Sequence, residues 1–363
     1  MSKKEQVLEK VGEQLKDLGK RYEYTPIKLS KLQIDENFKE VSIGATLEAS
    51  AVKQLAKILE IPGSFFIDLN KRDRKAWELL TDRLSKVKDS DLILYHDKKE
   101  KFLSSIFPAE WKYNTPTENF DTLNQIIEVK IDQGLDLRTA VADVHGLYAE
   151  FTTQDACEVY SKDVFKRGVG IYLFHSNLQA SGADGLLERL VCTNMAYAPS
   201  RALKFKIKRE SHKPSEAIFA AMDKVLAGNF NYLYEKIRAL KDTTVSLNEA
   251  EIFYSYLSKF TTVEKDKENK DVIVSLFKDI DKNIPMDKIY AKYNLDEHKA
   301  PSRKWASTAS TPLNAYDLFN YVTNCGIREN LKQLDSLSLK IKGGEMITRP
   351  WDMRVMAPSV NWN

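Results

Sequence analysis

The sequence predicts an α+β fold, in which a curved, mainly antiparallel sheet over about residues 91–210 packs against long helices. Two observations predict it. Before residue 90 and after residue 210, apolar residues recur every three or four positions, which is the period of an amphipathic helix. Between these points apolar and polar residues alternate, and turn-forming Gly, Asp and Asn separate the segments, as in antiparallel strands. We expect one compact unit made of a mostly helical region (1–90), the sheet (91–210), a helical region packed on it (211–342) and an extended tail (343–363).

The first 90 residues are expected to contain several helices and one short strand. The N-terminal segment predicts a surface helix whose apolar stripe consists of Val7, Leu8, Val11, Leu15 and Leu18. The segment KEVSIGATL alternates and predicts a strand over 39–47. Thr46 can then cap a helix over 47–60, which Pro62 ends, and a further helix is expected over 73–87.

The sheet region is predicted from segments whose apolar residues recur at every second position. In chain order these segments are DLILY, IIEVKID, LDLRTAVADV, LYAEFTT, GVGIYLFHSNL, LLERLVCTNM and LKFKIKR. Because no long helical pattern separates the later segments, neighbouring strands are expected to pair antiparallel.

The region after the sheet returns to the helical period. A long helix is expected from Ser215 to Leu240, with a bend at Gly228, and a second helix over 247–260. The segment EKDKENKD, residues 264–271, is charged at nearly every position and predicts a solvated loop or helix end.

A last helix is expected from Pro312 to Cys325, with Thr311 as its N-cap. Its apolar face consists of Ala315, Leu318, Phe319 and Val322. After Lys342 the helical period is lost, which indicates an extended tail.

Composition bounds the class of protein. Of the 363 residues 43% are hydrophobic and 29% charged, which is typical of a globular chain. Lys and Arg number 55 against 52 Asp and Glu, so a histone-like binder that uses its whole surface is excluded, whereas a local basic site is not. No apolar run approaches the roughly 18 residues that cross a bilayer, and the N-terminus lacks an apolar signal core. The three widely separated cysteines form no CxxC pair or disulfide framework, so we expect a cytoplasmic protein without membrane contact.

The segment 203–209 carries the strongest signal for a binding site. Strict alternation places Lys204, Lys206 and Lys208 on one side of a strand, with ammonium groups about 6.6 Å apart, a row that can follow a phosphate backbone. The basic residues that flank this row are Arg201, Arg209 and Lys213. The alternative interpretation is the solvated outer face of an amphipathic strand.

Single-strand binding also needs aromatic side chains on which bases can stack. Tyr197, which lies close to Arg201, is the predicted exposed ring. The other aromatic residues of this region are expected in the core, namely Tyr160, Phe165, Tyr172 and Phe174.

An enzyme is not expected. The chain contains no HExxH, no closely spaced His and Cys set and no phosphate-binding glycine loop, so neither a metal nor another cofactor is predicted. Asp143, His145 and His175 could meet across a sheet, but they have no established ligand spacing. Cys157 or Cys192 with a histidine could form a nucleophilic pair, although Cys192 is expected to face the core.

Three segments together resemble one family. They are LEASAVKQLAKILEIPGSFFIDL, LLERLVCTNMAYAPSRALKFKIKRESHK and STPLNAYDLFNYVTN, in that order along the chain. They are similar to the phage/plasmid-like proteins, a family of unknown function encoded on phages, prophages and conjugative plasmids. This chain departs from the family pattern with Met195 after Asn194, and with Thr323-Asn324-Cys325 where an acidic residue and a histidine are common. The resemblance implies a mobile-element protein that acts in nucleic acid metabolism or host interaction, and it supplies no reaction.

We therefore expect a non-catalytic phage or plasmid accessory protein, located in the cytoplasm of the host cell. It would bind single-stranded DNA or RNA in annealing or recombination, and by analogy with such proteins it would form a homo-oligomer. The alternative is a host-takeover or anti-defence factor that binds a host or phage protein. Its contact would be the tail, which carries Trp351, Met353 and Trp362.

Overall fold

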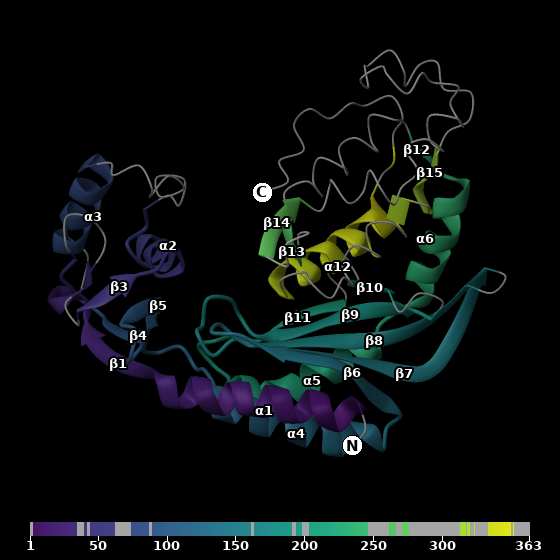
Figure 1. Ribbon diagram of the computed structural model, residues 1–363, viewed down its shortest axis with the longest axis horizontal. Helices are drawn as coiled ribbons and strands as arrows, with labels where there is room; N and C mark the ends of the chain where they lie inside the picture. The colour runs from purple at the N-terminus through teal and green to yellow at the C-terminus, as the bar shows by residue number, and fades with distance from the viewer. Residues whose placement is uncertain are drawn as a thin grey trace, which may run out of the picture. The chain divides into compact units, whose positions relative to one another are not determined.

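The computed structural model confirms the α+β class (Figure 1). The structure describes residues 3–34, 40–41, 44–61, 74–86, 89–160, 163–190, 194–197, 203–245, 261–265, 271–275, 313–316, 318–319, 323, 333–349 and 351. The chain divides into two compact units. The first comprises Met1–Phe151, Val169–Asp184 and Lys204–Leu226, and the second Thr152–Gly168, Gly185–Leu203 and Ala227–Asn363. Among the described helices, none is both long and apolar enough to cross a membrane.

The N-terminal part of the first unit contains a sheet with strand order β1-β4-β5-β3-β2. Its strands are β1 (Tyr22–Lys28), β2 (Glu40–Val41), β3 (Ala45–Leu47), β4 (Asp91–Asp97) and β5 (Phe102–Pro108). All pairs are antiparallel except β3 with β5. The predicted single strand over 39–47 is instead two short strands, because the chain reverses at Gly44, whose φ of +68° suits glycine. The strands β1 and β5 were not predicted from the sequence.

Two predicted helices lie beside this sheet. They are α2 (Ala49–Ile58) and α3 (Arg74–Lys86), and α2 packs on β5. The core beneath them is apolar and includes Leu55, Leu59 and Leu80, each fully buried. Glu48, rather than the predicted Thr46, is the residue that precedes α2, and its side chain makes no capping hydrogen bond.

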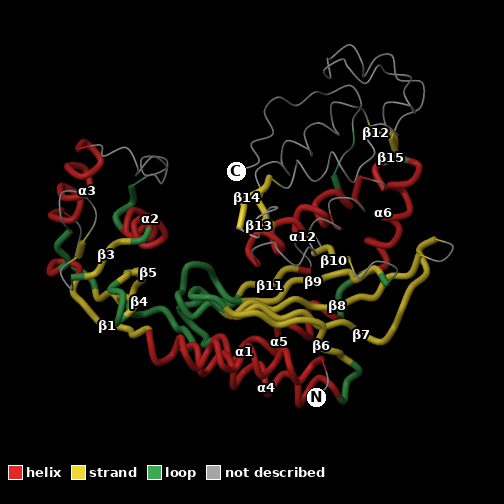
Figure 2. The backbone as a smooth tube through the Cα atoms, in the orientation of Figure 1, coloured by secondary structure: helices red, strands yellow, loops and turns green. Residues whose placement is uncertain are grey.

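Three further helices of this unit pack side by side (Figure 2). They are α1 (Lys3–Arg21), α4 (Pro116–Ile131) and α5 (Pro214–Leu226), with α1 against α4 and β6, and α5 against α4 and β11. The predicted stripe of α1 is oriented as expected, since Val11 and Leu15 are buried.

The strand predicted over 126–132 is wrong, because residues 126–131 belong to α4 and Asp132 is its C-cap. The helix begins with a capping box: Thr115 Oγ1 accepts the backbone N–H of Glu118 at 3.2 Å, and Glu118 Oε2 accepts that of Thr115 at 2.7 Å. Pro116 occupies the first helical position, where its missing N–H costs nothing. The β-branched Ile126 is buried on a helical face rather than in a sheet.

The second sheet has strand order β10-β9-β8-β7-β6, and β11 also pairs with β9. Its strands are β6 (Leu135–Ala142), β7 (Leu147–Tyr160), β8 (Asp163–Leu173), β9 (Gly182–Arg189), β10 (Asn194–Tyr197) and β11 (Lys204–Lys206). Consecutive strands are neighbours as far as β10, as expected for the mainly antiparallel sheet that the alternation predicted.

The long helix predicted from Ser215 to Leu240 is two helices, α5 and α6 (Asn231–Asp242). The break falls at 227–230, a segment that contains Gly228, so the predicted bend is a full interruption. Two short strand pairs follow. They are β12 (Thr244–Val245) with β15 (Leu313–Asn314), and β13 (Thr261–Lys265) with β14 (Asp271–Ser275).

The C-terminal region differs from the prediction at two places. Residues 313–314, expected in a helix, form β15, although Ala315, Leu318 and Phe319 are buried as predicted. The expected extended tail is wrong over 343–348, because α12 (Gln333–Thr348) continues through it and packs on β10 and α6. One helical face of α12 is buried, consisting of Leu339, Gly343, Met346 and Ile347. The described residues do not include the helix predicted over 247–260. They also do not include Val322, Met353 and Trp362.

Candidate nucleic-acid interface

The predicted basic strand is present but shorter than expected. β11 pairs antiparallel with β9, with Lys204 opposite Asp184 and Lys206 opposite Gly182. The backbone N–H of Ile207 donates to the Ser181 carbonyl at 2.8 Å and extends this contact by one residue. The chain then turns, because the Lys208 carbonyl accepts backbone N–H groups from the residues that follow it.

Gly182 allows β11 to lie this close to β9. A Cβ atom at position 182 would be 2.1 Å from the carbonyl oxygen of Phe205, far inside van der Waals contact. Only glycine fits at this crossing of two backbones.

The side chains of this segment follow the predicted alternation in part. Leu203 and Ile207 are buried at 1% and 6% exposure, and Phe205 is half-buried. Lys206 and Lys208 are exposed, whereas Lys204 is half-buried. Two of the three predicted ammonium groups therefore face solvent.

Lys204 interacts with a buried carboxylate of the protein. Its Nζ lies 3.9 Å from a carboxylate oxygen of Asp184, whose other oxygen accepts the Tyr172 hydroxyl at 2.8 Å. Burial raises the pKa of Asp184 above its ordinary value, while Tyr172 and the positive charges of Lys204 and Lys206 oppose that shift. Lys204 thus compensates a buried carboxylate and offers less charge to a ligand than its neighbours do.

Arg209 also has an internal partner. Its guanidinium lies over the Trp111 ring, 4.3 Å from the centroid. Its Nε is buried, and no described residue forms a hydrogen bond with it. Burial lowers the pKa of Arg209, although Glu210 opposes the shift. The backbone N–H of Lys112 donates to the Arg209 carbonyl at 2.6 Å, so residues 111–112 run beside the end of the basic segment. Trp111 is half-buried and Lys112 exposed.

Lys213 forms an ion pair that sequence reasoning did not foresee. Its Nζ lies 3.0 Å from Glu118 Oε1, and both side chains are 42% exposed. Such a pair contributes about 0–1 kcal/mol and leaves Lys213 partly accessible.

The two remaining predicted residues cannot be assigned to this surface. Arg201 lies outside the described residues, and Tyr197 is placed in β10 opposite Leu186 without a described side chain. Trp111 and Lys112 were missed by the sequence analysis, because only folding brings the β5–α4 connection beside Arg209.

We define the basic surface as Lys206 and Lys208 together with the adjacent Trp111 and Lys112. It combines exposed ammonium groups with a ring that is fixed from one side by a guanidinium. This combination can contact phosphates and a base.

Of the two histidines considered as metal ligands, His175 is engaged in the fold through its ring. His175 is fully buried, its Nε2 lies 3.0 Å from the Val144 carbonyl, and its Nδ1 lies 3.3 Å from Asn119 Nδ2. Burial lowers the pKa of His175 to about 3. Asp143 accepts the backbone N–H groups of His145 and Gly146 and so closes a turn. Within the described ranges, no group of three or more His, Cys, Asp or Glu is arranged to hold a metal ion.

Comparison of the chain with protein-family models, curated proteins and solved structures gives no match. The fold and the basic surface define an α+β protein with a cationic segment at a sheet edge. The resemblance to phage/plasmid-like proteins stays an expectation from the sequence.

Proposed function

We propose that the chain binds single-stranded nucleic acid at the basic surface and acts without catalysis. One observation carries the proposal: Lys206 and Lys208 are exposed at alternate positions, and neither forms an ion pair within the part of the chain that the structure describes. Unpaired ammonium groups at this spacing, about 6.6 Å, can neutralise phosphates and release their counterions.

Trp111 supports the choice of a single strand over a duplex. Bases of a single strand are free to stack on an aromatic ring, and each such contact is worth about 1–3 kcal/mol. The guanidinium of Arg209 fixes the indole from one side, so little ordering is needed when a base arrives.

The resemblance supports a biological setting. It favours an accessory protein of a phage or plasmid that acts in annealing or recombination in the host cytoplasm, and an oligomer is expected by analogy. A protein-binding tail has less support, since Trp351, its described ring, already contacts the Arg349 guanidinium at 5.2 Å.

The test is fluorescence anisotropy with labelled single strands of unrelated sequence, measured over a range of salt concentrations. Lys206→Ala/Lys208→Ala removes two charges from the basic surface. Lys98→Ala/Lys99→Ala removes two exposed charges from the β4–β5 turn of the same unit and is the matched control.

The first variant should weaken binding of every sequence and flatten the log–log salt dependence by about 1.4 units, at about 0.7 per phosphate. The control should keep the wild-type slope. Equal losses in both variants would indicate diffuse charge and not a site. Absence of binding by the wild type at low salt would overturn the proposal, and a protein partner would then be the leading candidate.

A further inference from the structure

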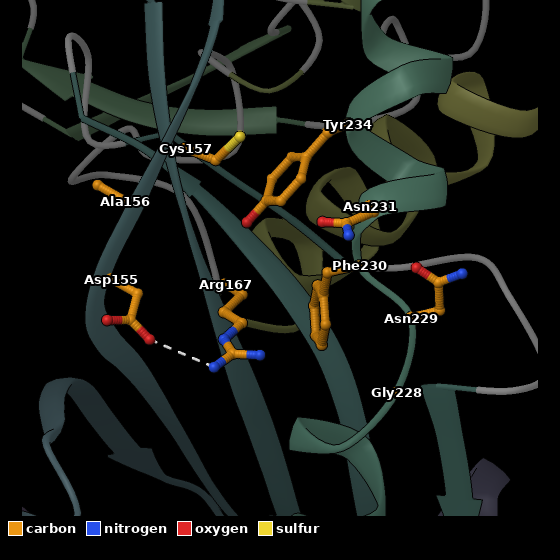
Figure 3. Close-up of a pocket in the computed structure, with 9 residues that line it drawn as sticks. All are labelled: Asp155, Ala156, Cys157, Arg167, Gly228, Asn229, Phe230, Asn231 and Tyr234. Atoms are coloured by element: carbon orange, nitrogen blue, oxygen red, sulfur yellow. Dashed lines mark hydrogen bonds and ion pairs between the residues drawn. The ribbon is translucent and has the colours of Figure 1, made fainter.

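A pocket of about 310 Å³ lies among β7, β8 and residues 228–234, within the second unit (Figure 3). This volume is at the lower end of the range of small-molecule sites, about 300–1,000 Å³. The side chains that matter to its chemistry are Asp155, Cys157, Arg167, Phe230, Asn231 and Tyr234.

Tyr234 presents an unused hydrogen-bond donor to this pocket. The residue is only 6% exposed, and its hydroxyl has no hydrogen-bond partner among the described residues. In Figure 3 the hydroxyl points into the pocket, toward Arg167. Burial raises the pKa of Tyr234 to about 12. Cys157 and Asp155 add smaller contributions in the same direction, and Arg167 opposes them. The hydroxyl therefore keeps its proton at neutral pH.

Arg167 is held only weakly by the protein. One guanidinium nitrogen lies 3.3 Å from an Asp155 carboxylate oxygen, and the two side chains are 39% and 80% exposed. An exposed, single-contact pair of this kind contributes about 1 kcal/mol at most, so a ligand oxyanion can replace the Asp155 carboxylate. A carboxylate or phosphate can then accept two parallel N–H bonds from the guanidinium.

The remaining wall suits a flat apolar group. Phe230 is 3% exposed and lines the pocket with its ring, and Cys157 contributes a free thiol. The Asn231 side chain also lies on the pocket wall in Figure 3 and can donate or accept a hydrogen bond. The wall therefore combines the Arg167 cation and its Asp155 partner with two neutral hydrogen-bonding groups and an aromatic surface.

We propose that this pocket binds a small organic oxyanion with a flat body: Arg167 and Tyr234 hold the carboxylate or phosphate, and the body lies against Phe230. Two classes of small molecule carry both an oxyanion and a flat ring, namely mononucleotides and aromatic carboxylates. The site is independent of the basic surface, because none of its residues belongs to that surface.

The thiol of Cys157 gives a direct readout of occupancy in the full chain. Its rate of alkylation by iodoacetamide is followed by peptide mass spectrometry. The rate is measured with 2′-deoxyadenosine 5′-monophosphate, benzoate, inorganic phosphate or deoxyadenosine. We expect the monophosphate or benzoate to slow alkylation and deoxyadenosine, which lacks the anion, to leave it unchanged. Protection by the monophosphate would identify the ligand as a mononucleotide, and protection by benzoate would identify it as an aromatic carboxylate.

Three variants assign the effect to named groups. Arg167→Gln and Tyr234→Phe should each raise the half-protecting concentration about tenfold, as expected for the loss of a hydrogen bond to a charged group. Asp155→Asn should lower the half-protecting concentration, because this substitution removes the carboxylate that competes with the ligand for Arg167. Lys166→Gln removes a charge from the adjacent position of β8, which faces the other side of the sheet, and should change nothing.

The inference is overturned if no anion protects Cys157 at millimolar concentration, or if deoxyadenosine protects as well as its monophosphate. Unchanged protection in Tyr234→Phe would also overturn it. That variant keeps the buried ring, so it decides the question even if Arg167→Gln fails to fold.

Discussion

The guanidinium of Arg209 lies 4.3 Å from the centroid of the Trp111 ring, and this contact joins the connection after β5 to the turn after β11. A cation over an indole is worth about 0.5–1 kcal/mol at an exposed site and about 2 kcal/mol or more when it is desolvated. Because no described residue forms a hydrogen bond with the buried Nε of Arg209, the Trp111 ring is a main compensation for this cation. Arg209 was predicted from the sequence as a phosphate contact. In the proposed binding site it would instead hold the Trp111 ring in place.

We predict that Trp111→Ala weakens oligonucleotide binding without changing its salt dependence. A stacked base contributes about 1–3 kcal/mol and involves no phosphate, so affinity should fall while the log–log slope stays constant. Anisotropy titrations at several salt concentrations measure both quantities, and Trp111→Phe should retain part of the affinity. A flattened slope, like that expected for the lysine variant, would contradict a stacking role.

Gly182→Ala should displace β11. The added Cβ would lie 2.1 Å from the Phe205 carbonyl oxygen, so one backbone must move, at a cost typical of overpacking, about 1–3 kcal/mol. Hydrogen exchange of the Ile207 amide, which donates to Ser181, should become faster. Gln179→Ala, at an exposed neighbouring position, is the control. An unchanged exchange rate for Ile207 in Gly182→Ala would show that the sheet edge tolerates the methyl group.

Much of this architecture could be predicted from the sequence because periodicity reports which face is buried. The alternation of β6–β9 and the helical stripes of α1 and α2 are of this kind. α4 could not be recognised by that route, since Ile126, Ile127 and Val129 favour a strand locally. The spacing of Thr115 and Glu118 was the available signal for a helix start, and packing then decided in its favour.

The candidate site was predictable only in part for a different reason. The alternation at 203–209 identifies which lysines share a face, but not whether a carboxylate on another strand meets one of them. Asp184 does so for Lys204. The Arg209–Trp111 contact likewise joins distant segments that no local pattern relates.

Phe319→Ala should lower the free energy of unfolding by about 3–5 kcal/mol, because the ring is 2% exposed. Urea denaturation followed by circular dichroism measures the change. The matched aromatic control is Tyr232→Ala, because Tyr232 lies in the same unit and is 45% exposed. This substitution should change the free energy of unfolding by about 0.5 kcal/mol or less. Equal stability of Phe319→Ala and the wild type would contradict the burial of this helical face.

His175 should make stability depend on pH in the mildly acidic range. Burial lowers its pKa from about 6.5 in the unfolded chain to about 3 in the fold, despite the opposing hydrogen bond to the Val144 carbonyl. Between these values the unfolded state binds more protons. The free energy of unfolding should therefore fall as pH is lowered, by up to about 1.4 kcal/mol per unit from this residue.

This contribution should be absent in His175→Gln and retained in His212→Gln, which changes an exposed histidine. Urea denaturation at pH values between about 7 and 5 compares the three proteins. Parallel pH profiles for the wild type and His175→Gln would rule out this assignment.

Glu118 uses its two carboxylate oxygens for two different neighbours. Oε2 accepts the backbone N–H of Thr115 in the capping box, and Oε1 lies 3.0 Å from the Lys213 ammonium. The start of α4 and the segment that leads into α5 therefore share one anion. Substitutions of Thr115 and Lys213, although far apart in sequence, should give a non-zero interaction energy in a double-mutant cycle. A single side chain thus makes the local stabilities of two helix termini mutually dependent.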